Sequence, residues 1–469
     1  MGIPNWAQFN PAAANPQAIL ATLGAAVCAV SRPPSRVLRY LTSWPVLATL
    51  FVIATISVPM IIIGYIAPCG AMQDTVASGE LLAGRSAYPH DLRPIVRHLL
   101  QEDPPPSTFP WLRRLQASHM GCLYSLDLNA HPPLVPVALE PLVAAIGYYK
   151  PILIFQALSL ASLVLMIVLW TKGLGIVLEP RQFALVLLVL LGSEPVFEVF
   201  RGAGLSGLLA MLIVATWYLL RTDREWRAGT VLAIAACLKL FPLIAAAVFL
   251  FKRIRAFFAF ALSGLAIVLG IFWLHGVGIF EEYIATAHSD VNGYDWLRNN
   301  YGLFANIRYL LHGDLKLLEP LVVFIYASLL FVAGAALYRL RNQSAVCCDF
   351  GMALAATLMC LFSPVVWSHY FIILFLPFCI VSRYSRWWES RGASVAFFLL
   401  IASVDGAPVD KLSTLAKTGI FFSLPTVGVL AIFIWLSAEA FHVPAVATPQ
   451  SETRRPPFTP PKLRLRLQT

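Results

Sequence analysis

Charged residues are scarce in this sequence. Asp, Glu, Lys and Arg make up 12% of its 469 residues, about half the share that a water-soluble domain carries. The hydrophobic share is 59%, and the mean hydropathy is +0.74. Between Ser43 and the basic tail near Arg454, apolar runs recur that have the length of roughly 20 residues needed to cross a bilayer. These features exclude a soluble globular domain and predict an all-α polytopic membrane protein.

Several motifs of soluble enzymes are absent as well. The sequence has no Walker motif, no Rossmann glycine pattern and no metal-ligand spacing among its eight cysteines. We therefore expect neither ATP nor a nucleotide sugar as the direct substrate, and neither a metal nor another cofactor. Cys69 and Cys122 both fall in the first long polar loop. If that loop is extracytoplasmic, a disulfide between them is permitted.

The net charge, formally +10, lies in short basic clusters between the apolar runs. These clusters are Arg32–Arg39, Arg221–Arg227, Lys252–Arg255, Arg339–Arg341, Arg383–Arg391 and the tail from Arg454. Nucleic-acid-binding proteins gather such residues on one face or stripe, whereas membrane proteins carry them in cytoplasmic loops. We therefore expect the clusters in the cytoplasm and no nucleic-acid partner.

This placement of the clusters predicts about twelve spans with both chain ends in the cytoplasm. Residues 1–42 would form a cytoplasmic or interfacial segment, residues 43–440 the transmembrane domain, and residues 441–469 a disordered basic tail. The first strong span, Trp44–Ile66, would leave the cytoplasm. The long loop 67–131 is then expected outside.

Two basic clusters lie too close together for two full crossings. Only 24 residues separate Arg227 from Lys252, although both are expected in the cytoplasm. Two half-length helices with a turn at Lys239–Pro242 would solve this, because proline breaks a helix and lysine can reach polar surroundings. Lys239 lies in the middle of an apolar run, where a charge needs a partner. A buried anion such as a phosphate is the partner we expect.

Carboxylates mark two places on the expected outer side. Asp74 is suited to take a proton from a hydroxyl acceptor, but the Thr-Val-Ala-Ser that follows it also favours a helix N-cap. Glu194, Glu198 and Arg201 lie at the outer end of one span. Charges at that depth are costly and tend to be functional or paired, and a Glu198–Arg201 helical pair is the structural alternative.

Aromatic and amide residues mark two further places. The turn SPVVWSHY contains Trp367 and His369; an interfacial tryptophan is ordinary, and a lone histidine is more often structural than catalytic. The loop VNGYDWLRNNYG contains Asn299 and Asn300. Such groups bind sugars, but they also occur in ordinary turns.

The order of these pieces, from about Asp74 to Pro377, resembles glycosyltransferase family 87, whose members use polyprenol-phosphate sugars. The matching pieces are Asp74 with Gly84 and Tyr88; His131-Pro132-Pro133-Leu134; Glu194-Pro195 with Arg201-Gly202; Lys239 with Pro242; and Ser363, Pro364, Trp367 and His369. The chain departs from the family pattern in lacking a Gly-Gln-x-Asn element and in carrying His131 where the family has an aromatic residue.

The resemblance implies a GT-C fold in the plasma membrane. It also implies inverting transfer of mannose or arabinose from a polyprenyl phosphate to a lipid or glycan acceptor on the extracytoplasmic side. Asp74 would be the catalytic base, with Asp91 and Asp127 as alternatives. Lys239, His369 and Arg201 would bind the donor phosphate. Contacts to the sugar or acceptor would come from Tyr88, His131, Glu194, Trp367, Asn299 and Asn300.

Two other functions remain open. A transporter or flippase of a lipid-linked sugar would explain a charge at Lys239, although no internal repeat is visible. A scaffold protein that has lost catalysis would explain the missing Gly-Gln-x-Asn element. The enzyme hypothesis requires Asp74, Lys239, Arg201 and His369 to meet around one cavity.

Overall fold

The computed structural model describes residues 69–89, 92, 94–95, 131–148, 150–191, 193–202, 204–251, 253–294, 300–310, 315–384 and 424–443. Regular structure within these residues is helical throughout. The helices of the first half are α4 (Cys69–Leu82), α7 (Leu134–Ile146), α8 (Lys150–Leu174), α9 (Pro180–Leu191), α10 (Glu194–Gly202), α11 (Ser206–Arg221), α12 (Glu225–Leu238) and α13 (Leu243–Phe249). Those of the second half are α14 (Ile254–His275), α15 (Gly278–Tyr294), α16 (Leu303–Leu310), α17 (Leu315–Leu340), α18 (Ser344–Phe362), the 3-10 helix η4 (Ser368–Leu374), α19 (Phe375–Tyr384) and α22 (Leu424–His442).

Some predictions fall outside the described residues. They concern the segment 1–42, the span Trp44–Ile66, the tail beyond residue 443, and the residues Asp91, Cys122, Asp127 and Asn299. The disulfide between Cys69 and Cys122 therefore stays a prediction.

Among the described residues, four helices are long and apolar enough to cross a membrane. They are α8, α14, α18 and the part of α17 from Glu319 to Leu340. The 22 residues of α14 extend about 33 Å at 1.5 Å per residue, close to the thickness of the hydrocarbon core. The described part of the chain thus has the helices of a membrane protein. The count of about twelve spans stays a prediction.

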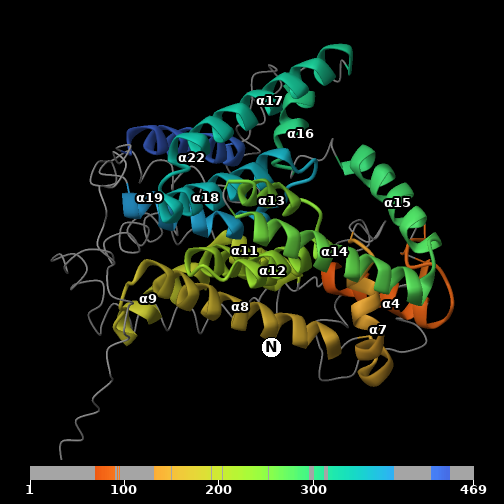
Figure 1. The fold of residues 1–469 in the computed structure, drawn as a ribbon. Helices are drawn as coiled ribbons and strands as arrows, with labels where there is room; N and C mark the ends of the chain where they lie inside the picture. The colour runs from red at the N-terminus through yellow and green to blue at the C-terminus, as the bar shows by residue number, and fades with distance from the viewer. Residues whose placement is uncertain are drawn as a thin grey trace, which may run out of the picture.

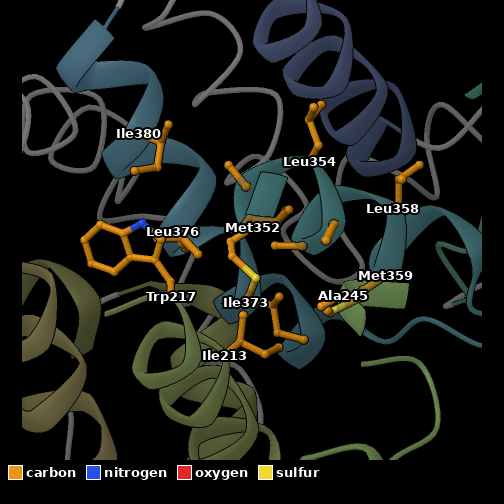
Figure 2. Close-up of a cluster of buried hydrophobic side chains, with 14 of the residues drawn as sticks. Ile213, Trp217, Ala245, Met352, Leu354, Leu358, Met359, Ile373, Leu376 and Ile380 are labelled. Carbon is orange, nitrogen blue, oxygen red and sulfur yellow. The ribbon is translucent and has the colours of Figure 1, made fainter. Parts of the chain in front are cut away.

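Helix α18 lies at the centre of the bundle (Figure 1). It contacts α11, α13, α17, α19 and α22, and all residues from Cys347 to Leu361 are buried. A helix that is hydrophobic all round is expected in such a core. Figure 2 shows Met352 and Met359 of α18 among Ile213 of α11, Ala245 of α13 and Ile373 of η4.

The apolar run between the two close basic clusters is a broken helix, as predicted. Helix α12 ends at Leu238, and Lys239 adopts an extended conformation. Pro242 then caps the start of the seven-residue helix α13. The chain therefore enters the bundle in α12, turns near Lys239, and returns in α13.

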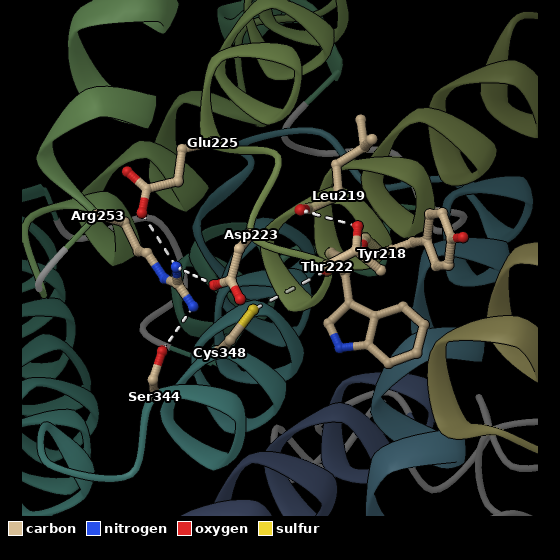
Figure 3. Close-up of polar contacts among 9 residues, drawn as sticks. Tyr218, Leu219, Thr222, Asp223, Glu225, Arg253, Ser344 and Cys348 are labelled. Carbon is tan, nitrogen blue, oxygen red and sulfur yellow. Dashed lines mark hydrogen bonds and ion pairs between the residues drawn. The ribbon is translucent and has the colours of Figure 1, made fainter. Parts of the chain in front are cut away.

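The basic clusters at the two ends of this excursion meet through Arg253. Its Nη1 donates to Asp223 Oδ1 at 2.6 Å and to Glu225 Oε1 at 3.0 Å, and its Nη2 donates to Ser344 Oγ at 2.6 Å (Figure 3). The starts of α12, α14 and α18 consequently lie at one end of the bundle, which we call the basic end. This confirms that the clusters around Arg221–Arg227 and Lys252–Arg255 share one side.

A buried carboxylate ties three helices together near the basic end. Asp349 of α18 is fully buried. Its Oδ1 accepts a hydrogen bond from Trp217 Nε1 at 2.8 Å, and its Oδ2 accepts one from the Tyr384 hydroxyl at 2.6 Å. Arg221, the last residue of α11, forms an ion pair with the same Oδ2. Both carboxylate oxygens are therefore satisfied.

The opposite end, which we call the far end, is built from α4, α7, α15 and the end of α14 (Figure 1). Ala77, Tyr88, Ile271, Ile279 and Tyr283 form a small hydrophobic cluster there. Two polar contacts reinforce it: His275 Nε2 lies 3.0 Å from Glu140 Oε1, and Ser86 Oγ donates to Glu282 Oε2 at 2.5 Å. Helix α14 thus carries the chain from the basic end to this cluster.

Removing the arginine that pairs with Asp349 is expected to destabilise the bundle. Arg221→Leu leaves a buried carboxylate without its countercharge, a change that typically costs about 3–5 kcal/mol. We expect a clear fall in the thermal unfolding temperature in detergent. The exposed Arg227 provides a matched control, and Arg227→Leu should leave the temperature unchanged. If the double variant Arg221→Leu/Asp349→Leu is less stable than Arg221→Leu alone, the explanation is wrong.

The crossing of α12 and α14 depends on a glycine. A Cβ atom at Gly229 would lie 2.1 Å from the Ala256 carbonyl oxygen and 2.7 Å from Ala259 Cβ. Gly229→Ala must push the two helices apart, and overpacking of this kind typically costs about 1–3 kcal/mol. A lower unfolding temperature is expected. Gly264→Ala on α14, where the added Cβ meets nothing within 4 Å, should match the parent protein. Equal temperatures for both variants would contradict the packing.

Candidate active site

Asp74 lies inside helix α4, five residues after its start at Cys69. The N-cap interpretation of Asp74 is therefore wrong: the cap assignment used only the local residue types, whereas the helix begins more than one turn earlier. The side chain is completely buried. Its Oδ1 lies 2.5 Å from Nδ1 of His131. Its Oδ2 is also buried and has no hydrogen-bond partner among the described residues.

His131 is held in place by Tyr88. The Tyr88 hydroxyl donates to the His131 carbonyl oxygen at 2.9 Å, and its ring packs against Tyr283 of α15 with 5.6 Å between centroids. Burial, and then the neighbouring Tyr283 and Asp74, raise the pKa of Tyr88, so its hydroxyl stays protonated and able to donate. Gly84 adopts φ +69° in the turn that leads from α4 to Tyr88, a conformation that glycine favours.

The turn after α12 brings Lys239 to η4. The Lys239 ammonium donates a hydrogen bond to the Tyr370 hydroxyl and lies 3.9 Å from the centroid of the same ring, a cation–π geometry. The ring of His369 packs edge-on against Tyr370 with 4.5 Å between centroids, and Phe241 packs against it at 5.4 Å. Tyr370 thus joins two predicted residues, Lys239 and His369, although the sequence analysis did not single it out.

Asn300 holds the Ser363–Trp367 turn in place. Its Nδ2 donates to the Pro364 carbonyl at 2.9 Å, and its Oδ1 accepts from the backbone N–H groups of Gly302 and Val366, both at 2.9 Å. A Cβ at Gly302 would lie 2.9 Å from the Ser363 carbonyl oxygen, so the two segments approach closely only because this residue is glycine. Asn300 therefore uses its amide to fix the backbone that precedes Trp367 and His369.

Helix α10 connects the two halves of the site. It contacts both α4, which carries Asp74, and η4, which carries His369. Glu194 and Arg201 lie at opposite ends of this short helix, and Glu198 between them is buried. The helices that carry Asp74 and His369 thus contact the same helix. That Asp74, Lys239, Arg201 and His369 meet around one cavity stays a prediction.

The site lies away from the basic end. Helix α18 starts at Ser344 beside Arg253 and runs for 19 residues, about 28 Å, before the Ser363–Trp367 turn. Helix α14 spans a similar length from Arg253 to His275. His275 contacts Glu140 of α7, so α14 ends at the far end. No group of three or more His, Cys, Asp or Glu side chains suited to a metal ion occurs in the described part of the chain.

The fold and this site define a helical membrane protein with a buried carboxylate–imidazole pair at one end. A family model, that of glycosyltransferase family 87, matches residues 130–364, about half of the chain. The chain belongs to this family and is therefore a glycosyltransferase, which confirms the resemblance drawn from its motifs. No curated protein and no solved structure matches it.

Loss of the Asn300 amide is expected to release the Ser363–Trp367 turn. Asn300→Ala leaves the buried N–H groups of Gly302 and Val366 without their acceptor, and each such group costs about 1–3 kcal/mol. We expect a lower unfolding temperature. We also expect faster proteolytic cleavage within the turn, with the fragments identified by mass spectrometry. Asn342→Ala, the same change at an exposed position, is the control. Unchanged stability and proteolysis in Asn300→Ala would show that the turn does not depend on this amide.

Proposed function

We propose that this glycosyltransferase moves a sugar, mannose or arabinose, from a polyprenyl phosphate to a lipid or glycan acceptor, with inversion at the anomeric carbon. The observation that carries the proposal is Asp74: it is fully buried, one oxygen is held by His131, and the other has no hydrogen-bond partner among the described residues. A buried acceptor of this kind needs a donor, and an acceptor hydroxyl group supplies one.

In the proposed reaction, Asp74 Oδ2 takes the proton of the acceptor hydroxyl while the hydroxyl oxygen attacks the anomeric carbon. The bond between that carbon and the phosphate oxygen breaks, and its electron pair leaves with the polyprenyl phosphate. General-base catalysis of this type contributes about 10²- to 10⁴-fold. The phosphate is already a good leaving group, so the proposal requires no metal.

Cationic groups would stabilise the departing phosphate. Lys239 is seated on Tyr370, next to His369, and we propose that these two residues bind the phosphate oxygens together with Arg201. Groups that are already in position where negative charge develops lower the barrier without reorganising.

The remaining predicted residues divide into two groups. Glu194, Trp367 and Asn299 stay proposed contacts for the sugar or acceptor. Tyr88 and Asn300 use their polar groups to hold His131 and the Ser363–Trp367 turn. We propose that these two shape the site rather than bind the sugar.

The side of the membrane follows from the charges. Basic loops favour the cytoplasm, so the basic end around Arg253 is proposed to face inward. The Ser363–Trp367 turn, one length of α18 away, would then face the extracytoplasmic side of the plasma membrane. A polyprenyl-phosphate sugar would reach it laterally from the outer leaflet.

Transfer by the purified protein in nanodiscs tests the proposal. The donor is polyprenyl-phosphate mannose or arabinose, the acceptor is a panel of envelope glycolipids, and the product is measured by mass spectrometry. Asp74→Asn should lower kcat by at least about 10²-fold. Asp223→Asn is the matched control, because Asp223 lies at the basic end and is largely exposed; it should keep full activity.

Variants of the phosphate site test the second half of the proposal. Lys239→Met should weaken donor use, seen as a lower kcat/KM for the donor, because the phosphate loses a cation in both the ground state and the transition state.

Full transfer by Asp74→Asn would remove the proposed base. Movement of the lipid-linked sugar across liposomes without any covalent product would instead favour a flippase.

A further inference from the structure

We infer that His131 is a positioning residue for Asp74: its Nδ1–H holds Oδ1 and thereby directs Oδ2 toward the acceptor hydroxyl. This inference rests on the proposed function, because it concerns the same carboxylate. It assigns His131 a role in orienting the base in place of a contact with the sugar.

The contact itself defines the proton on His131. A base that takes a proton from the acceptor must be ionised, and an ionised carboxylate only accepts hydrogen bonds. In the proposed function, the 2.5 Å contact between Asp74 Oδ1 and His131 Nδ1 therefore places the hydrogen on Nδ1. Hydrogen bonds to a charged acceptor are shorter and stronger than neutral ones. The Nδ1 tautomer, or the imidazolium, is therefore the form that holds Asp74.

Nearby hydroxyl groups on α4 do not serve the carboxylate. Thr75 Oγ1 donates to the Met72 carbonyl oxygen at 3.1 Å, and Ser78 Oγ donates to the Asp74 carbonyl oxygen at 2.7 Å. A buried carboxylate without donors is strongly disfavoured. Among the described residues, His131 therefore supplies the hydrogen bond that makes a charged Asp74 tolerable inside the protein.

The histidine is held from its backbone side as well. The Tyr88 hydroxyl bonds to its carbonyl oxygen, and two prolines, Pro132 and Pro133, follow before α7 starts. Proline fixes φ near −65°, so the chain has little freedom at this junction. The imidazole side chain is 13% exposed, whereas that of Asp74 is 1% exposed. The imidazole is thus the more accessible member of the pair, and its backbone is held on both sides.

No proton needs to leave His131 during the transfer. The acceptor proton moves to Asp74 Oδ2, and the electron pair of the broken bond moves to the phosphate. The hydrogen bond from Nδ1 to Oδ1 persists throughout, so the histidine acts by orienting the base and not by exchanging a proton with substrate.

Two substitutions of opposite design separate orientation from packing. His131→Asn keeps an N–H donor close to the position of Nδ1, whereas His131→Phe keeps the ring shape and has no donor. If His131 positions Asp74, the Phe variant should lose at least about tenfold in kcat with little change in the KM for the donor, and the Asn variant should keep most of kcat. If His131 only fills space, the order of the two variants reverses, and the inference is overturned.

Chemical rescue gives a readout that does not depend on the folding of the Phe variant. His131→Ala leaves room for a small molecule, and imidazole, which carries an N–H, should restore part of kcat at alkaline pH. 1-Methylimidazole, which has no N–H when neutral, should not. Equal rescue by both, or by neither, contradicts the proposed hydrogen bond.

Asp74→Asn separates the positioning role of His131 from the proposed function. Full kcat in His131→Phe beside an inactive Asp74→Asn overturns the positioning role and leaves the proposed function standing. Full kcat in Asp74→Asn, or no transfer by the parent protein, overturns the proposed function and this inference with it.

Discussion

The way an apolar helix bundle accommodates negative charge determines much of this structure. A carboxylate inside such a bundle is tolerated only when donors or cations surround it. Asp349 and Asp74 are both fully buried, but they meet this requirement differently. Asp349 has both oxygens engaged, by Trp217, Tyr384 and Arg221, and so fastens three helices. Asp74 has one oxygen bound by His131 and a second without a partner among the described residues. Asp349, with both oxygens engaged, therefore has a structural role. Asp74, with one oxygen left for a donor, is where we expect the chemistry.

Basic side chains likewise have two different roles, one at the basic end and one beside η4. Arg253 gathers the starts of α12, α14 and α18 through hydrogen bonds with Asp223, Glu225 and Ser344. The break between α12 and α13 places Lys239 beside η4. There its ammonium group lies over the ring of Tyr370. An aromatic face stabilises a cation without cancelling its charge. Basic side chains therefore serve architecture at the basic end and, in the proposed function, phosphate binding beside η4.

Sequence reasoning succeeded where a single physical rule dominated. The spacing of basic clusters required the helix break at Lys239–Pro242, and the ordered motifs indicated glycosyltransferase family 87. The N-cap alternative for Asp74 was wrong, because it considered only the residues that follow Asp74, whereas α4 already includes the residues from Cys69 onward. The pairing of Asp74 with His131 joins positions 57 apart, and the seat of Lys239 on Tyr370 joins positions 131 apart. Such contacts are set by tertiary structure and leave no local pattern.

The excursion formed by α12 and α13 sets a requirement on how the chain is inserted into a membrane. A translocon that scans for apolar stretches meets about 24 residues that resemble an ordinary crossing, yet the finished segment enters and leaves on one side. Counting this stretch as a crossing would invert the orientation of every helix that follows it. The contacts of Arg253 with Asp223 and Glu225 join the two ends of this excursion, as a segment that returns to the end of the bundle where it began requires.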